Sequence, residues 1–226
     1  MEHHYDLFYK YVKEGDLNKL IGFYDEHHKY LDISADNDNA FRLACTHGKL
    51  RVAQWLYHTK PSINISAEHE ESFRRACCNG YLEVAQWLFE NNPNIRVSIF
   101  NEGPFREACT NGHLHVAQWL YKIKPTIDIS INHEHAFWSA CGNGYLDIAQ
   151  WLYFTKPNID ISANNDKAFY TACVNGYLLV AQWLYQINPN ISISTFQRTF
   201  SATSDFNYDI ITQWLILKCP YIKLYE

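Results

Sequence analysis

The chain has 226 residues, of which 47% are hydrophobic and 16% aromatic, and its formal net charge is −5. This apolar content excludes a wholly disordered chain, and a negative balance without a basic run argues against nucleic acid as a partner. The opening stretch MEHHYDLFYKYVKEGDL is polar and no apolar stretch of about 18 residues follows, so we expect no membrane span and an intracellular, cytoplasmic protein.

Residues 1–34 carry Phe8, Gly15, Leu17 and Leu20 in a spacing that the following residues repeat more strictly. The exterior of this segment is polar, which suits the end of an array that faces water. We therefore predict an N-terminal capping repeat over residues 1–34.

Residues 35–194 repeat every 32 residues. The phrase AQWL begins at Ala53 and returns four times at this interval, and serine, phenylalanine and glycine keep the same step. A fixed period describes one building unit laid side by side, whereas a catalytic pocket needs unlike groups converging on one point. We predict five repeats, with no enzymatic activity and no cofactor. The serines in step are Ser34, Ser66, Ser98, Ser130, Ser162 and Ser194.

Each repeat has two helical patterns. The stretch AFRLACTHG, which ends at Gly48, places apolar residues at i, i+3 and i+4 and closes on a glycine. The stretch VAQWLY, from Val52 to Tyr57, puts its apolar residues on one face before Pro61 ends the pattern. These patterns predict a helix-turn-helix unit.

The segment between repeats alternates in polarity. Ile63-Asn64-Ile65-Ser66 and its counterparts IRVS, IDIS, IDIS and ISIS favour an extended connector. Since two short helices cannot bury their apolar faces alone, the repeats must stack. The predicted fold class is all-α, a solenoid of helix-turn-helix units with short extended connectors.

Tryptophan and cysteine also keep the period. We expect the tryptophans to stack on one another in the seam between second helices, where each aromatic buries about 150–250 Å². Five cysteines recur in step and are predicted to be small buried residues in a reducing compartment, with no metal or redox site. The tryptophans are Trp55, Trp87, Trp119, Trp151, Trp183 and Trp214, and the cysteines are Cys45, Cys77, Cys109, Cys141 and Cys173.

Residues 195–226 keep the pattern imperfectly. Gln213-Trp214-Leu215 returns one residue early, and Cys219-Pro220 ends the segment. We predict a C-terminal capping repeat here.

The repeats AFRLACTHGKLRVAQWLY, from Ala40, and PFREACTNGHLHVAQWLY, from Pro104, resemble the ankyrin repeat. The period is one short of the family's usual 33 or so. The histidine of the family phrase T-P-L-H is replaced by Arg42, Arg74, Arg106, Trp138 and Tyr170, and the glycine after the second helix by Lys60, Asn92, Lys124, Lys156 and Asn188. AQWLY followed by KPxIxIS also resembles ankyrin arrays of giant double-stranded DNA viruses.

The resemblance implies a scaffold that binds a partner protein through the concave face formed by first helices and connector tips. The alternative is a structural or decoy protein acting by abundance or self-association, and an enzyme is a distant third. We expect a monomer with no nucleic-acid or membrane partner. The candidate partner-binding residues differ between repeats on this face or lie in the connectors: Arg42, Arg74, Arg75, Arg106, Glu107, Trp138, Tyr170, Glu70, Glu102, Glu134, His133 and His135.

An acidic residue recurs in the connectors, and Glu70, Glu102 and Glu134 belong to this column. Five equivalent acids on an open face lack the unlike environments that separate a catalytic acid from a base. Each acid precedes a first helix, where a carboxylate complements the helix dipole. His133-Glu134-His135 lacks a complete ligand set nearby, so we predict no metal site.

Overall fold

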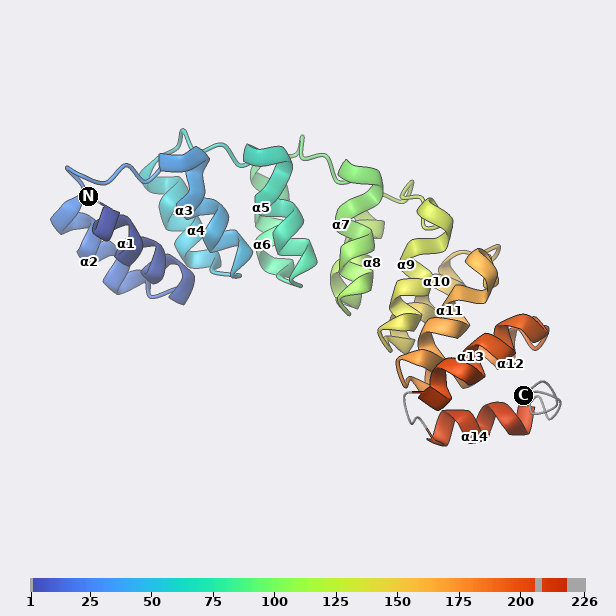
Figure 1. Ribbon diagram of the computed structural model, residues 1–226. Helices are drawn as coiled ribbons and strands as arrows, with labels where there is room; N and C mark the ends of the chain where they lie inside the picture. The colour runs from blue at the N-terminus through green and yellow to red at the C-terminus, as the bar shows by residue number, and fades with distance from the viewer. Residues whose placement is uncertain (1, 206–208, 219–226) are drawn as a thin grey trace. The chain divides into compact units, whose positions relative to one another are not determined.

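The computed structural model describes residues 2–205 and 209–218, which form fourteen helices and no strand (Figure 1). The predicted all-α class is confirmed. No helix within these ranges is long and apolar enough to cross a membrane. The helices are α1 (Glu2–Glu14), α2 (Leu17–His27), α3 (Ala35–Thr46), α4 (Leu50–Thr59), α5 (Ala67–Cys78), α6 (Leu82–Asn91), α7 (Ile99–Thr110), α8 (Leu114–Ile123), α9 (Ile131–Gly142), α10 (Leu146–Thr155), α11 (Ala163–Val174), α12 (Leu178–Ile187), α13 (Ile193–Asp205) and α14 (Asp209–Lys218).

The chain divides into two compact units. Unit 1 comprises residues 1–108 and 118–124, and unit 2 comprises residues 109–117 and 125–226. Within unit 1, α3 packs against α1 and α5, and within unit 2, α11 packs against α9 and α13. The second helices α4, α6 and α12 each pack against the first helix of their own repeat. In both units the first helices therefore lie side by side and are covered by the second helices.

Glycine closes the first helix, as predicted. Gly48 has a φ of 69°, a left-handed conformation, and the N–H of Lys49 donates to the carbonyl of Ala44 at 2.8 Å. This bond satisfies a carbonyl at the helix end. A Cβ on Gly48 would lie 2.5 Å from the ring of Tyr81 in the next repeat. Both the backbone conformation and the neighbouring ring therefore require glycine here.

The repeated apolar residues form the core of each unit. Phe41, Ala44 and Cys45 of α3 and Val52 and Leu56 of α4 are 0–1% exposed. Their counterparts 32 residues on, Phe73, Ala76, Cys77, Val84 and Leu88, are equally buried at 0–2%. Burying one such large side chain stabilises the fold by about 1.5–3 kcal/mol. We call these constant buried residues the frame of the repeat, and they form the core of each unit.

The tryptophans lie between successive second helices, as predicted, but they do not form a column. The ring of Trp87 meets the edge of Tyr57 at 5.6 Å and 84°, and Trp183 meets Tyr153 at 5.8 Å and 87°. Edge-to-face pairing suits the ring quadrupoles. Each tryptophan is only partly buried. The prediction of stacked tryptophans is wrong, because Trp87 and Trp183 each face a tyrosine of the preceding repeat and Trp119 faces Phe89.

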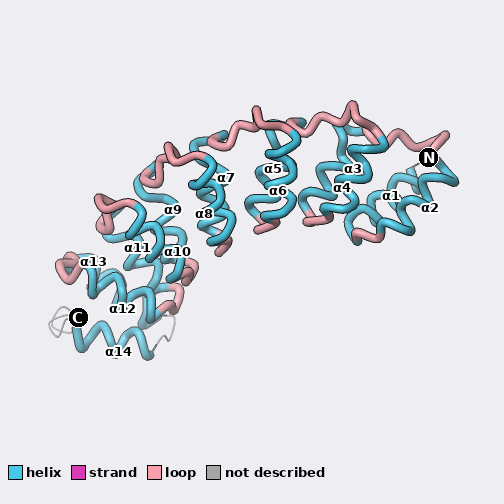
Figure 2. The backbone as a smooth tube through the Cα atoms, turned by 180° about the vertical axis from the view of Figure 1, so that it is seen from behind, coloured by secondary structure: helices cyan, strands magenta, loops and turns pink. Residues whose placement is uncertain are grey.

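The connectors are built from turns. The N–H of Ile63 donates to Lys60 and the N–H of Ala67 donates to Asn64, each at 3.0 Å. Ile63 and Ile65 are buried while Asn64 is exposed, so the predicted alternation is confirmed. The turns lie at residues 61–62 and 65–66, on either side of Ile63 and Asn64, and Figure 2 shows these connectors of unit 1 as loops along one edge of the helix pairs.

A polar clasp joins neighbouring repeats inside each unit. Asn92 Nδ2 donates to Ser66 Oγ at 2.8 Å, and Asn188 Nδ2 donates to Ser162 Oγ at 2.9 Å. Lysine occupies the same position in other repeats and bonds to the preceding serine in the pairs Lys60–Ser34 and Lys124–Ser98. Four of the periodic serines thus accept a hydrogen bond from the residue that replaces the family's glycine, whereas Lys156 pairs with Glu134.

The five periodic cysteines are buried and carry free thiols, as predicted. Burial raises the pKa of Cys45 to about 12, and it also raises the pKa of the other four thiols: Cys77, Cys109, Cys141 and Cys173. A thiol deprived of water disfavours its charged form.

Truncating a frame residue should cost more than truncating the indole that touches it. Phe73 is fully buried and its ring lies 6.2 Å from that of Trp119, which is partly buried. We expect Phe73→Ala to lower the free energy of unfolding by about 3–5 kcal/mol and Trp119→Ala by about half of that. Urea denaturation followed by circular dichroism measures both. An equal or larger loss at Trp119 would contradict the assignment of the core.

The buried thiols should make stability fall at alkaline pH. The pKa of the Cys45 thiol is 9.0 in the unfolded chain and about 12 in the folded chain. Between these two pH values only the unfolded chain loses the proton. One such thiol lowers the free energy of unfolding by about 1.4 kcal/mol per pH unit between about pH 9 and 12. Cys45→Ala should flatten the slope by that amount in urea titrations near pH 10. An unchanged slope would show that the thiol ionises in the fold.

Candidate protein-binding surfaces

Each central repeat opens its first helix with three left-handed residues. Their φ values lie between 51° and 62°, and none is glycine. Such residues cost roughly 1–2 kcal/mol each, although asparagine and aspartate tolerate this conformation better than most. The neighbouring groups must therefore hold the turn in place. The left-handed turns are residues 36–38, 68–70, 100–102, 132–134 and 164–166.

The third residue of each turn is the periodic acid, and it points inward. In unit 1, Asp38 Oδ2 accepts the N–H of Asn64 at 2.9 Å. In unit 2, Glu134 Oε1 accepts the N–H of Asp160 and pairs with Lys156 Nζ, both at 3.2 Å. These acids directly precede the right-handed part of the helix, as predicted, and they hold the following connector.

Burial corrects the role expected of three acids. Glu70, Glu102 and Glu134 are 3%, 8% and 5% exposed, so their carboxylates do not face a partner. Glu70 Oε1 accepts from Arg96 Nε at 3.2 Å, and Glu102 accepts from Ser98. They belong to the frame because each carboxylate accepts a hydrogen bond from a residue of its own unit.

The arginines of unit 1 hold the left-handed turns. Arg74 Nε donates to the carbonyl of His69 at 2.9 Å and its Nη2 to that of Glu68 at 3.4 Å. Arg106 makes the same pair of bonds, at 2.7 and 3.0 Å, to Asn101 and Phe100. The turn carbonyls are therefore capped from within the repeat.

Arg42 repeats this arrangement and is further neutralised. Its guanidinium donates to Asn37 and Asp36 at 3.0 and 2.9 Å and pairs with Glu71. Arg75 is exposed and lies 3.6 Å from the same Glu71 carboxylate. Glu107 is also exposed. Arg42 thus serves the fold, and Arg75 and Glu107 are the more accessible charges of this surface.

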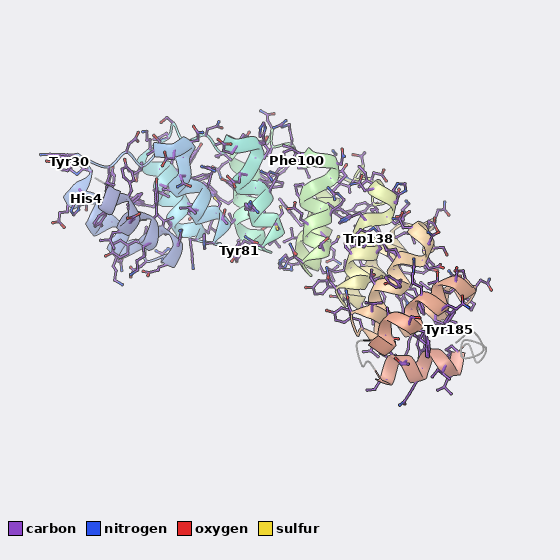
Figure 3. The ribbon with its side chains drawn as sticks, in the orientation of Figure 1. His4, Tyr30, Tyr81, Phe100, Trp138 and Tyr185 are labelled. Atoms are coloured by element: carbon purple, nitrogen blue, oxygen red, sulfur yellow. The ribbon has the colours of Figure 1, made fainter. Side chains whose placement is uncertain are left out.

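Unit 2 places aromatic residues where unit 1 has these arginines. Lys167 Nζ lies 3.4 Å from the ring centroid of Trp138, and the Arg198 guanidinium lies 4.2 Å from that of Tyr170. Arg198 Nη2 also donates to the carbonyl of Asn165, in a left-handed turn, at 3.1 Å. We call Trp138, Lys167, Tyr170 and Arg198 the cation–aromatic ladder. It runs over α9, α11 and α13, and Figure 3 labels Trp138 on it.

The two histidines lie beside the start of this ladder. His133 is exposed in its left-handed turn, and the ring of His135 lies 4.6 Å from that of Trp138. Among the described side chains, no three histidine, cysteine or acidic groups gather closely enough to hold a metal ion. The contact between His135 and Trp138 is an aromatic one.

Sequence reasoning missed Lys167 and Arg198. Lys167 follows a periodic acid at a position that varies between repeats, which could have indicated it. Arg198 lies in the irregular last repeat, where the period no longer predicts which side chains meet. The aromatic half of the ladder was therefore predicted, and of the cationic half only Lys167 left a signal in the sequence.

Unit 1 has a different exposed feature around Phe100. Its ring is 54% exposed in a left-handed turn, with Arg74 4.9 Å from the centroid (Figure 3). A bulky aromatic in this conformation is unusual. An apolar groove of about 650 Å³ adjoins it, and the lining includes Phe89, Ile95, Val97, Ile99 and Ile123. The other four repeats carry Asp36, Glu68, Asn132 and Asn164 at this position.

Helix pairs of fixed period, with a buried frame and varying side chains on the first helices, define a helical repeat protein. Sequence models of ankyrin repeats in three copies match residues 73–165 and 105–195, and a model of ankyrin repeats in many copies matches residues 40–89. The chain belongs to the ankyrin-repeat family, as the repeat phrase predicted.

A solved structure agrees with this assignment. The crystal structure of the human ASB11 ankyrin repeat domain is similar, with a TM-score of 0.66 and 16% identity, over 93% of this chain and 96% of that one. At this identity the likeness shows the fold. A comparison with curated proteins gave no match. Ankyrin repeats are in general non-catalytic modules for protein–protein interaction, which is the broad role of the family.

Adjacent arginines offer a matched test of the turn-capping role. We expect Arg74→Met to lower the free energy of unfolding by about 1 kcal/mol, because two carbonyls of a left-handed turn lose their donor. Arg75→Met should change it by less than about 0.5 kcal/mol, since an exposed ion pair contributes little. Thermal and urea denaturation of the two variants measure the difference. Equal losses would mean that the arginine at position 74 does not hold the turn.

Proposed function

We propose that this protein is an interaction scaffold that binds a partner protein through the face formed by its first helices and left-handed turns. One observation supports it most: the constant apolar residues of the first helices are buried, while exposed and partly exposed positions on this face change between repeats. Constant residues cannot distinguish partners, so specificity must come from the positions that vary. Aromatic and arginine side chains, which mark binding hot spots, occupy several of them.

Unit 2 offers the strongest part of this face. Trp138 and Tyr170 are partly exposed. Of the two cations that lie over their rings, Lys167 is partly exposed and Arg198 is exposed. In unit 1 the corresponding arginines donate to the turns, and the exposed groups of this face include Phe100, Arg75 and Glu107. The two units therefore contribute chemically different surfaces.

A second function is self-association, as in a structural or decoy protein. It is favoured by large apolar side chains on the surface of unit 2, where Phe154, Leu179 and Leu217 are 74%, 70% and 77% exposed. Light scattering over a concentration range separates the two functions. A mass that rises with concentration favours self-association, and a constant monomer mass favours the scaffold.

The proposal includes the setting in which the scaffold acts. The phrase AQWLY followed by KPxIxIS supports a viral protein that binds host proteins, and the buried free thiols fit a reducing cytoplasm. Residues 1–34 and 195–226 serve as capping repeats in this proposal. Their sequences keep the apolar pattern of the repeat only in part, which fits repeats at the two ends of an array.

Truncation of the aromatic residues should release the partner. In affinity capture from host-cell lysate with mass spectrometry, we expect Trp138→Ala and Tyr170→Ala each to weaken the captured partner by about 2 kcal/mol or more, which is at least about 30-fold. Phe154→Ala, an exposed aromatic on the second helix α10, is the matched control and should change capture less than about twofold. Greater loss at Phe154 than at both ladder residues would move the site to the second helices.

A further inference from the structure

The cations of the ladder lack carboxylate partners. Among the side chains that the structure describes, no acidic oxygen lies within 4.0 Å of Lys167 or Arg198, whereas Arg42, Arg75 and Arg96 of unit 1 all have one. The nearby acid Asp166 is 6% exposed, and its Oδ2 accepts from Thr195 Oγ1 at 3.0 Å. Two positive charges therefore remain uncompensated on one face of unit 2.

A polar hollow adjoins the Arg198 end of the ladder. It has a volume of about 610 Å³, and hydroxyl and amide groups line it together with Arg198 and Asp166. Ser194 and Asn165 are exposed at its edge and can donate hydrogen bonds. Its lining is Ser162, Asn165, Asp166, Asn190, Ser192, Ser194, Thr195 and Arg198. The hollow thus combines a guanidinium with neutral donors, which is the chemistry that recognises a carboxylate.

We infer that the cation–aromatic ladder and this hollow bind an acidic segment of the partner protein. The inference rests on the proposed function and names the chemistry of its ligand. Aspartate or glutamate carboxylates pair with Arg198 and Lys167, while apolar side chains of the segment contact the aromatic edges. A guanidinium binds carboxylates in a bidentate manner, which adds geometric selectivity to the charge.

Nucleic acid fits this surface less well. Single strands bind by stacking their bases on open aromatic faces. Here Lys167 and Arg198 already lie over the rings of Trp138 and Tyr170. The net charge of −5 also repels a polyanion in general, so attraction to an acidic segment must be local to these two cations.

Fluorescence anisotropy with defined probes tests the inference on the full chain. The first probe is a fluorescein-labelled peptide of glutamate and aspartate with two phenylalanines, and the second has glutamine and asparagine in place of the acids. We expect the acidic peptide to bind at least about tenfold more tightly, with a difference that shrinks as salt is raised. A single-stranded oligonucleotide of equal charge is the third probe and should bind more weakly than the acidic peptide.

Charge variants locate the binding. Lys167→Gln and Arg198→Gln should each weaken the acidic peptide about fivefold or more, and Lys167→Arg should retain binding because it keeps the charge. Lys122→Gln, which removes an exposed charge on α8, is the matched control and should change binding less than about twofold. Circular dichroism verifies that each variant is folded.

Three results would overturn the inference: equal affinity for the acidic and amide peptides, tighter binding of the oligonucleotide, or an equal effect of Lys122→Gln. If the acidic peptide does not bind but Trp138→Ala still releases a captured partner, the scaffold function stands and the acidic ligand is wrong. If neither the affinity for the acidic peptide nor the capture of the partner changes in the ladder variants, both proposals fail.

Discussion

A pair of short helices cannot bury its own apolar face, and this deficit governs the structure within each unit. Phe41, Cys45 and Leu56 become fully buried only because neighbouring helix pairs are packed against them. The polar contacts follow the same rule. The serine clasp reaches into the neighbouring repeat and fixes how far each helix pair is shifted along its neighbour, while the buried acids hold the connector that ends their own repeat.

The left-handed turns show how strain and binding surface are connected. A turn of three non-glycine residues needs donors for its carbonyls, and in unit 1 an arginine of the same repeat supplies them. Where Tyr170 replaces that arginine, Arg198 of the following helix donates to the carbonyl of Asn165 instead. Where Trp138 replaces it, the amide of Asn164 donates to the carbonyl of His133. The replacement frees the helix surface for aromatic side chains. The surface of unit 2 is therefore a consequence of the way its turns are held.

Periodicity predicted the fold well because the core residues recur with it. The helices, the closing glycines and the buried cysteines all follow from spacing and residue size. The direction in which the acids point could not be predicted from spacing. The sequence shows that Glu134 precedes a helix, but it does not show that the N–H of Asp160 donates to its carboxylate. The same limit applied to the ladder, where Lys167 and Arg198 come from other helices than the rings they cover.

The serine clasp has a consequence for the length of the array. A central repeat such as residues 67–98 carries both halves of the clasp: Asn92 donates to the serine before the repeat, and Ser98 accepts from the following Lys124. Duplicating such a segment in the gene would give the new copy matching partners at both of its borders. Asparagine and lysine serve equally as donors, so the joint also tolerates sequence drift after duplication. Recombination can thus lengthen this chain without redesigning its interior.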